Sequence, residues 1–158
     1  MCLSACSLTK SHIKNLKQDI NAIENIQKNF TKSIHGMKKK SYHERLMLLR
    51  LPSLEFRRLR GDMIEVYKIV HEIYDPITTN KLFTRIPEHS STRKANTLNL
   101  LKKRTNTPFQ KFFTNRIINT WNALPNDVVN AINVNSFKNK IDAHFKSFLY
   151  STDLDHLK

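Results

Sequence analysis

Apolar residues recur every three or four positions over most of the chain, which is the spacing of one face of an α-helix. The first such stripe contains Ile13, Leu16, Ile20, Ile23, Phe30 and Ile34, with Gln27 at its one polar step. Gly36 follows, and glycine commonly ends a helix. The pattern predicts an amphipathic helix of about three heptads that packs on the protein's own helices, with a coiled-coil dimer as the alternative.

A second helical region covers residues 41–75 and is divided by a proline. Ser41 and Glu44 have the spacing of a capping box, which predicts a helix that begins at Tyr42. Pro52 has no N–H to donate, so it separates this helix from the next, and we expect it in the first turn of that longer helix. The buried stripe of the longer helix is predicted to contain Leu59, Met63, Val66, Val70 and Ile73.

Aromatic residues dominate the pattern after Pro108. Their stripe contains Phe109, Phe112, Phe113, Ile117, Trp121 and Leu124. Aromatic side chains beside basic residues can stack on bases in proteins that bind single strands. The helical spacing instead favours a buried face with Trp121 in the core. Asn133 is placed to cap a last helix, whose predicted buried stripe contains Val134, Phe137, Ile141, Phe145 and Phe148.

The sequence therefore predicts an all-α fold, with about five helices in an irregular bundle and one long basic loop. Residues 76–106 have no clear period and are rich in Ser, Thr and Asn, which predicts the loop, with Leu98, Leu100 and Leu101 docking part of it. We expect a single helical domain over residues 10–150. Residues 1–9 are predicted to be disordered, and residues 151–158 are predicted to form a frayed tail.

Charge adds a candidate function to this fold. The chain has 27 Lys and Arg against 13 Asp and Glu, which gives a net charge of +14. Residues 1–50 contribute +7 and residues 86–120 contribute +6, whereas residues 51–85 contribute +1 and residues 121–158 contribute 0. Such a basic surface favours polyanions, with nucleic acid as the first expectation and an anionic membrane as the second. The partner predicted here is nucleic acid, with no membrane.

The candidate phosphate-binding residues lie in clusters of Lys and Arg. They are Lys38, Lys39, Lys40, Arg57, Arg58, Arg60, Arg93, Lys94, Lys102, Lys103 and Arg104. Arg58 and Asp62 are four residues apart and are expected to pair on one helix face. Arg116, at the edge of the aromatic stripe, either pairs with a carboxylate at the edge of the core or extends its guanidinium outward.

The usual signatures of catalysis are missing from the sequence. Nucleotidyl transfer needs paired carboxylates that hold two metal ions, and the chain has no adjacent Asp pair, no Gly-rich phosphate loop and no Gly-x-Ser-x-Gly turn. Cys2, Cys6 and His12 do not make a zinc site, which normally needs four ligands. The sequence thus predicts neither cofactor nor catalysis. Two cysteines and no apolar span of membrane length make an intracellular protein the default, with the nucleus open as its compartment.

Three ordered blocks resemble the region downstream of the polymerase domain in jockey-type non-LTR retrotransposon reverse transcriptases. They are IENIQKNFTKSI at residues 23–34, YHERLMLLRLPSLEFRRLRGDMIEVYKIVH at residues 42–71, and FFTNRIINTWNALPNDVVNAINVNSFKNKID at residues 112–142. The parent protein would be an RNA-directed DNA polymerase. The resemblance implies that this region follows the polymerase domain, and that its first helix packs against that domain in longer members.

Two functions from different classes follow. The first is a non-catalytic C-terminal fragment of a retrotransposon-derived polymerase that binds RNA or single-stranded DNA without sequence preference through its basic clusters. The second is a helical module that binds another protein through its apolar stripes. The salt dependence of nucleic-acid binding separates them, because phosphate contacts release counterions and apolar contacts do not.

Overall fold

The computed structural model of the chain describes residues 4–79, 81–87, 96–103 and 112–151. It confirms the all-α prediction. The helices are α1 (Ser4–Ser33), α2 (Tyr42–Leu49), α3 (Leu54–Val70), α4 (Pro76–Thr79), α5 (Phe113–Arg116), α6 (Ile118–Asn122), α7 (Asn126–Val129), α8 (Val134–His144) and the 3-10 helix η3 (Lys146–Phe148). The extended pairing within the described part of the chain is a single antiparallel bridge between Arg85 and Leu100.

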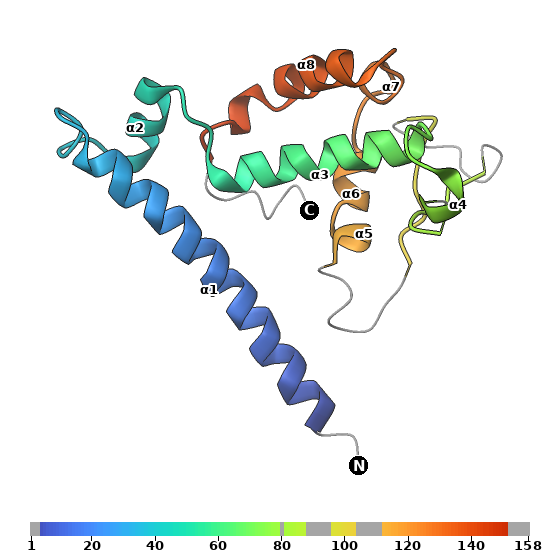
Figure 1. The fold of residues 1–158 in the computed structure, drawn as a ribbon, viewed down its shortest axis with the longest axis horizontal. Coiled ribbons are helices and arrows are strands. Elements are labelled where there is room, and N and C mark those ends of the chain that lie inside the picture. The colour runs from blue at the N-terminus through green and yellow to red at the C-terminus, as the bar shows by residue number, and fades with distance from the viewer. Residues whose placement is uncertain (1–3, 80, 88–95, 104–111, 152–158) are drawn as a thin grey trace.

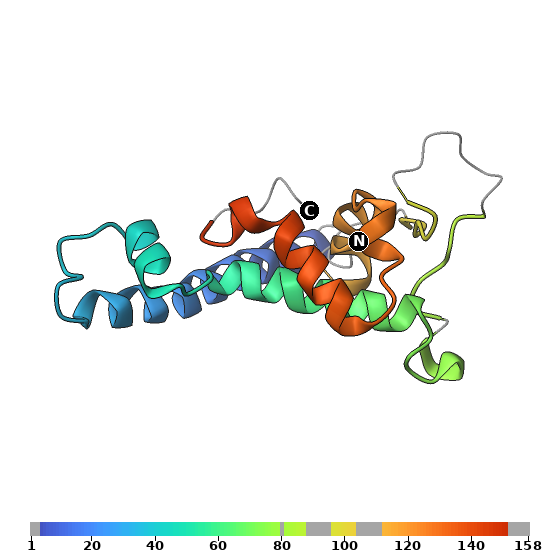
Figure 2. The ribbon, with the colours of Figure 1, turned by 90° about the horizontal axis from the view of Figure 1, so that it is seen from above.

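Helix α3 is the centre of the fold. Helix α8 packs along it, α7 leads into α8, and α1 meets both α2 and the beginning of α3. Figures 1 and 2 show α5 and α6 beside the second half of α3. Helix α1 runs away from the other helices, so that its N-terminal half stands apart from them in Figure 1.

The core lies between α3, α6 and α8. The stripe predicted for α3 is buried from Leu59 to Val70, but Ile73 is exposed because α3 ends at Val70. Trp121 is fully buried, as predicted, and its indole N–H donates to the Leu98 carbonyl at 2.8 Å. The rings of Tyr67 and Phe137 stack with centroids 4.4 Å apart, which joins α3 to α8.

The aromatic stripe is only partly buried. The predicted continuous helix is broken at Ile117 into the short helices α5 and α6. Ile117 and Leu124 are buried as expected, whereas Phe112 is exposed at the beginning of α5. Phe109 lies outside the described residues. On the last helix, Phe137, Ile141 and Phe145 are buried as predicted, with Val134 and Phe148 packed at the edge of the core.

Short-range signals identified where α2 and α8 begin. The predicted capping box is present: the Ser41 N–H donates to the Glu44 carboxylate at 2.7 Å, and the Glu44 N–H donates to the Ser41 hydroxyl at 3.2 Å. These bonds lower the pKa of Glu44. Asn133 caps α8 as predicted. Pro52, however, precedes α3 rather than lying in its first turn, because Ser53 takes the capping position.

Replacing Ser41 with alanine is expected to lower the free energy of unfolding by about 0.5–2 kcal/mol. The loss comes from the Glu44 N–H, whose hydroxyl acceptor at 3.2 Å is removed. Chemical denaturation followed by circular dichroism measures it, with Ser147→Ala, an exposed serine outside any capping box, as the control. Equal stability of Ser41→Ala and wild type would show that the box does not stabilise α2.

The predicted loop at residues 76–106 has more structure than its composition suggests. Leu98 and Leu100 dock on the core as expected, but Leu101 is exposed. Buried Asn96 donates to the carbonyls of Trp121 at 3.0 Å and Leu124 at 3.1 Å. The Asn96 side chain thus holds the docked segment to the end of α6, through partners more than twenty residues away in the sequence.

Two expectations for the N-terminal region are wrong. Helix α1 begins at Ser4, so residues 4–9 are helical rather than disordered, because no proline or glycine interrupts the chain before Gly36. Ile23 and Phe30 face solvent rather than the protein's own helices. The side of α1 that meets α2 and α3 is polar: Glu24 accepts from the Tyr42 hydroxyl and from the Leu54 N–H, and Gln27 donates to the Pro52 carbonyl.

Candidate nucleic-acid interface

The turn between α1 and α2 presents three consecutive lysines. Lys38, Lys39 and Lys40 are all exposed. The backbone beneath them is held by hydrogen bonds from the Met37 N–H to the Ile34 carbonyl at 3.0 Å and from the Lys40 N–H to the Met37 carbonyl at 3.1 Å. Gly36 adopts φ +76°, which other residues rarely adopt, and so allows the chain to reverse after α1.

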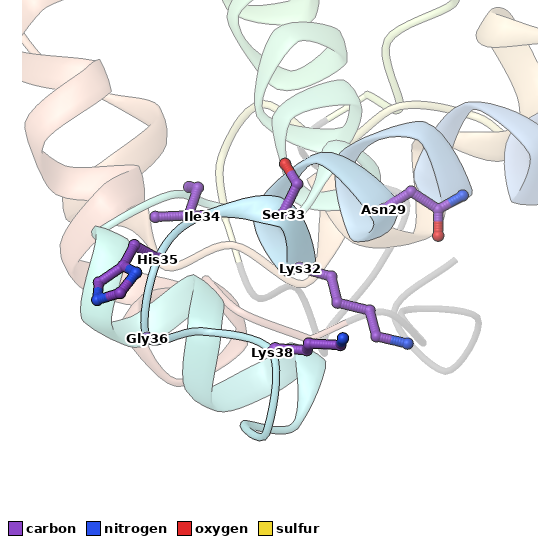
Figure 3. Close-up of a pocket in the computed structure, with 7 residues that line it drawn as sticks. All are labelled: Asn29, Lys32, Ser33, Ile34, His35, Gly36 and Lys38. Atoms are coloured by element: carbon purple, nitrogen blue, oxygen red, sulfur yellow. The ribbon is translucent and has the colours of Figure 1, made fainter.

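Lys32, from the last turn of α1, extends this cluster. Lys32 and Lys38 line the same shallow hollow and extend their side chains toward the same side of it in Figure 3. Asn29 and Ser33 contribute polar groups to the hollow. Sequence analysis missed Lys32, although its position in the last turn of a predicted helix is a signal that could have found it. We call Lys32, Lys38, Lys39 and Lys40 the lysine turn.

A buried arginine fixes the shape of the lysine turn. Arg45 donates through Nη1 to the Lys40 carbonyl at 2.6 Å, through Nη2 to the Lys28 carbonyl at 3.2 Å, and through Nε to the Thr31 hydroxyl at 3.2 Å. Its guanidinium lies 5.5 Å from the centre of the Tyr42 ring. These bonds tie the end of α1 to α2. Sequence analysis missed Arg45; its helical spacing with Tyr42 and Leu49 was the available signal.

A second set of contacts fixes α1 relative to α3. The Tyr42 hydroxyl donates to Glu24 at 2.5 Å, and the other oxygen of that carboxylate accepts from the Leu54 N–H at 3.1 Å. Gln27 donates to the Pro52 carbonyl at 3.2 Å. Burial, followed by the hydrogen bond to Glu24, raises the pKa of Tyr42. The lysine turn therefore lies beside a contact region where α1, α2 and the start of α3 are joined by hydrogen bonds.

The lysine turn keeps its cations available. The ion pairs among the described residues join Arg60 to Asp142, Lys68 to Glu65, Arg85 to Glu72 and Arg116 to Asp62. None of these pairs uses a lysine of the turn. Exposed ammonium groups without a carboxylate partner are the groups that exchange counterions for phosphates.

The three arginines at the start of α3 differ in availability. Arg57 is exposed, whereas Arg58 is half-buried, and burial together with the nearby charge of Arg116 lowers the pKa of Arg58. Arg60 donates twice to the Asp142 carboxylate, at 2.5 and 2.8 Å, which joins α3 to α8. A structural ion pair thus already occupies Arg60. Of the three, Arg57 is the most accessible to a ligand.

The expected pair between Arg58 and Asp62 is wrong. Asp62 instead accepts from Arg116, with distances of 2.6 and 2.8 Å from Nη2 and 3.1 Å from Nε. A guanidinium fork that arrives from α5 matches the two carboxylate oxygens, which a side chain one turn away on the same helix does not. Of the two alternatives for Arg116, pairing with a carboxylate at the edge of the core is confirmed.

The second predicted basic cluster lies far from the first. Lys102 and Lys103 are exposed just after the docked Leu100, while Arg93, Lys94 and Arg104 lie outside the described residues. Figures 1 and 2 both place the segment that ends at Lys103 at the opposite end of the molecule from the turn between α1 and α2. The fold therefore does not merge the two clusters into one patch.

The described residues contain neither a metal-binding cluster nor a membrane-spanning helix. No group of three His, Cys, Asp or Glu side chains that could hold a metal ion occurs among the described residues. Within that same part of the chain, no helix has both the length and the apolar character needed to cross a membrane.

Comparison with known proteins gave no match: no family model, no curated protein and no solved structure corresponds to this chain. The resemblance to retrotransposon reverse transcriptases therefore stays a prediction.

Proposed function

We propose that the chain is a non-catalytic module that binds RNA or single-stranded DNA through the phosphate backbone, and that it derives from the C-terminal region of a non-LTR retrotransposon reverse transcriptase. The origin is supported by the three sequence blocks at residues 23–34, 42–71 and 112–142. Nucleic-acid binding is supported by the net charge of +14 and by the exposed lysines of a turn that hydrogen bonds hold in place.

The lysine turn is the observation that carries the proposal. Neighbouring Cα atoms are about 3.8 Å apart, so three consecutive lysine side chains reach phosphates over a short length of one strand. Backbone hydrogen bonds and Arg45 already fix the conformation of the lysine turn, so ligand binding costs little backbone conformational entropy. Lys32 adds a fourth cation from α1.

The same chemistry predicts little sequence preference. A lysine ammonium is a point charge that recognises phosphate by charge rather than by the edges of bases. Contacts to phosphate position a strand but carry no sequence information. Among the described aromatic side chains of the stripe that could have stacked on bases, Trp121 is fully buried and Phe113 packs against the core, whereas Phe112 is exposed.

Replacing Lys38, Lys39 and Lys40 with alanine is expected to reduce the slope of log affinity against log salt by about 2, since each phosphate contact on a single strand contributes about 0.7. Fluorescence anisotropy of a labelled oligonucleotide over a salt series measures this slope. Circular dichroism checks that the fold is kept.

A matched control removes the same charge elsewhere. Lys81, Lys138 and Lys146 lie on different elements from the lysine turn. Their triple alanine variant is expected to change the slope by well under 1 because scattered charges do not converge on one strand. Equal losses in the two triple variants, or no binding by wild type at low salt, would exclude the lysine turn as the binding site.

A further inference from the structure

Helix α1 carries an exposed apolar face that the proposed function does not use. Ile23, Ile26 and Phe30 are 56%, 69% and 66% exposed. Their spacing of three and four residues places them side by side along one stripe of the helix. Large apolar side chains that gather on a surface usually mark an interaction site, whereas single ones do not.

This face is separate from the one that holds α1 to the rest of the protein. Glu24, Gln27 and Thr31 make the contacts to the segment around α2 and the start of α3. The exposed stripe lies roughly a quarter turn around the helix from them, at about 100° per residue. Because the contacts to α2 and α3 are made by that other face, a second helix can lie along the stripe without displacing α2 or α3.

The charge around the stripe favours a second copy of this chain. Its exposed neighbours on α1 are neutral: Gln18, Ala22, Asn25, Asn29 and Ser33. Among residues 18–34, whose side chains the structure describes, Lys28 and Lys32 are on the far side of the helix from the stripe, and Asp19 is the one charged residue in line with it. Two chains of net charge +14 repel one another over most of their surfaces, so a face without cations is where they can approach.

We infer that two copies of the chain associate by packing α1 against α1 through Ile23, Ile26 and Phe30. The stripes of two copies are complementary to each other, because apolar side chains of similar size occupy all three positions. Ile26 is the middle residue, so it meets its counterpart whether the two helices run parallel or antiparallel. Three side chains from each copy make a small interface, so the dissociation constant is expected at roughly 1–100 μM.

Sedimentation equilibrium over a range of protein concentrations tests the association. Wild type is expected to change from monomer to dimer within that range. Ile26→Asp, which brings two carboxylates to the centre of the seam, is expected to weaken association by at least about 100-fold. Ile132→Asp is the matched control, since Ile132 is 90% exposed outside the helices, and is expected to dimerise as wild type does. Circular dichroism confirms that both variants stay helical.

Chemical cross-linking tests the contact itself. In a Cys2→Ser, Cys6→Ser background, Ile26→Cys is expected to be joined to its counterpart by a short bifunctional maleimide, and Ile132→Cys is not. A wild type that stays monomeric up to about 1 mM would overturn the inference, and a different protein would then be the better candidate for binding this face. Equal association of Ile26→Asp and Ile132→Asp would also overturn it. Oligonucleotide binding by Ile26→Asp is expected to keep its salt slope, so this outcome is independent of the lysine turn.

Discussion

Replacing Trp121 with alanine is expected to lower the free energy of unfolding by about 3–5 kcal/mol, the usual range for truncating a large buried aromatic residue. Trp121 is fully buried, and its ring lies 6.0 Å from that of Phe137 on α8. Truncation leaves a cavity between α6 and α8 and removes the donor to the Leu98 carbonyl. Both effects act on the packing of α6 against α8 and against the docked segment at Leu98.

Denaturant unfolding followed by circular dichroism gives this free energy. Ile132→Ala is the control, because an exposed side chain is expected to change stability by less than about 0.5 kcal/mol. A loss below about 1 kcal/mol for Trp121→Ala would place that ring outside the core. The base-stacking alternative for the aromatic stripe would then regain support.

Replacing Arg45 with alanine is expected to lower the free energy of unfolding by about 2–4 kcal/mol, because hydrogen bonds from a charged donor contribute about 1.5–3 kcal/mol each and water recovers part of that loss. Arg45 is buried and bonds to the carbonyls of Lys28 and Lys40. It also covers the Tyr42 ring. Without it, the end of α1 loses its main link to α2.

Two further variants separate the causes of that loss. Arg45→Met keeps much of the packing while it removes the hydrogen bonds, so it is expected to recover only part of the stability. Arg50→Ala removes an exposed arginine next to the same helix and is expected to be nearly neutral. Equal stability of Arg45→Ala and Arg50→Ala in denaturant melts would contradict the role given to Arg45.

Features that depend on neighbours in the chain were predictable from the sequence. The capping box at Ser41 and the cap at Asn133 need partners only three residues away, so spacing alone identifies them. Burial of Trp121 followed from the helical spacing around it. The cluster at Lys38, Lys39 and Lys40 was visible as three adjacent letters.

Features that depend on the path of the chain were not predictable. Asp62 pairs with Arg116, which is 54 residues away, rather than with Arg58 on its own helix. Only the fold brings the Arg116 guanidinium into bidentate geometry with the Asp62 carboxylate. Arg60 likewise meets Asp142 through the packing of α3 on α8. The separation of the lysine turn from Lys102 and Lys103 is also a property of the fold, since net charge along the sequence carries no distance.

The first apolar stripe shows why periodicity alone does not decide burial. A repeating spacing identifies one face of a helix but does not identify what covers it. On α1 the polar residues Glu24, Gln27 and Thr31 make the contacts to the rest of the protein, because their partners are a hydroxyl, a guanidinium and free backbone groups. The side chains of Ile23 and Phe30 are therefore exposed and accessible to another protein surface.

The most direct test of the proposed function is to locate the bound strand by NMR. A ¹⁵N–¹H correlation spectrum of the full chain, titrated with a short oligothymidylate at low salt, reports which backbone amides sense the ligand. The largest shift changes are expected at residues 37–41 and at Lys32, with smaller changes at residues 100–103. Largest changes at residues 100–103, or an unchanged spectrum at saturating oligonucleotide, would contradict binding through the lysine turn.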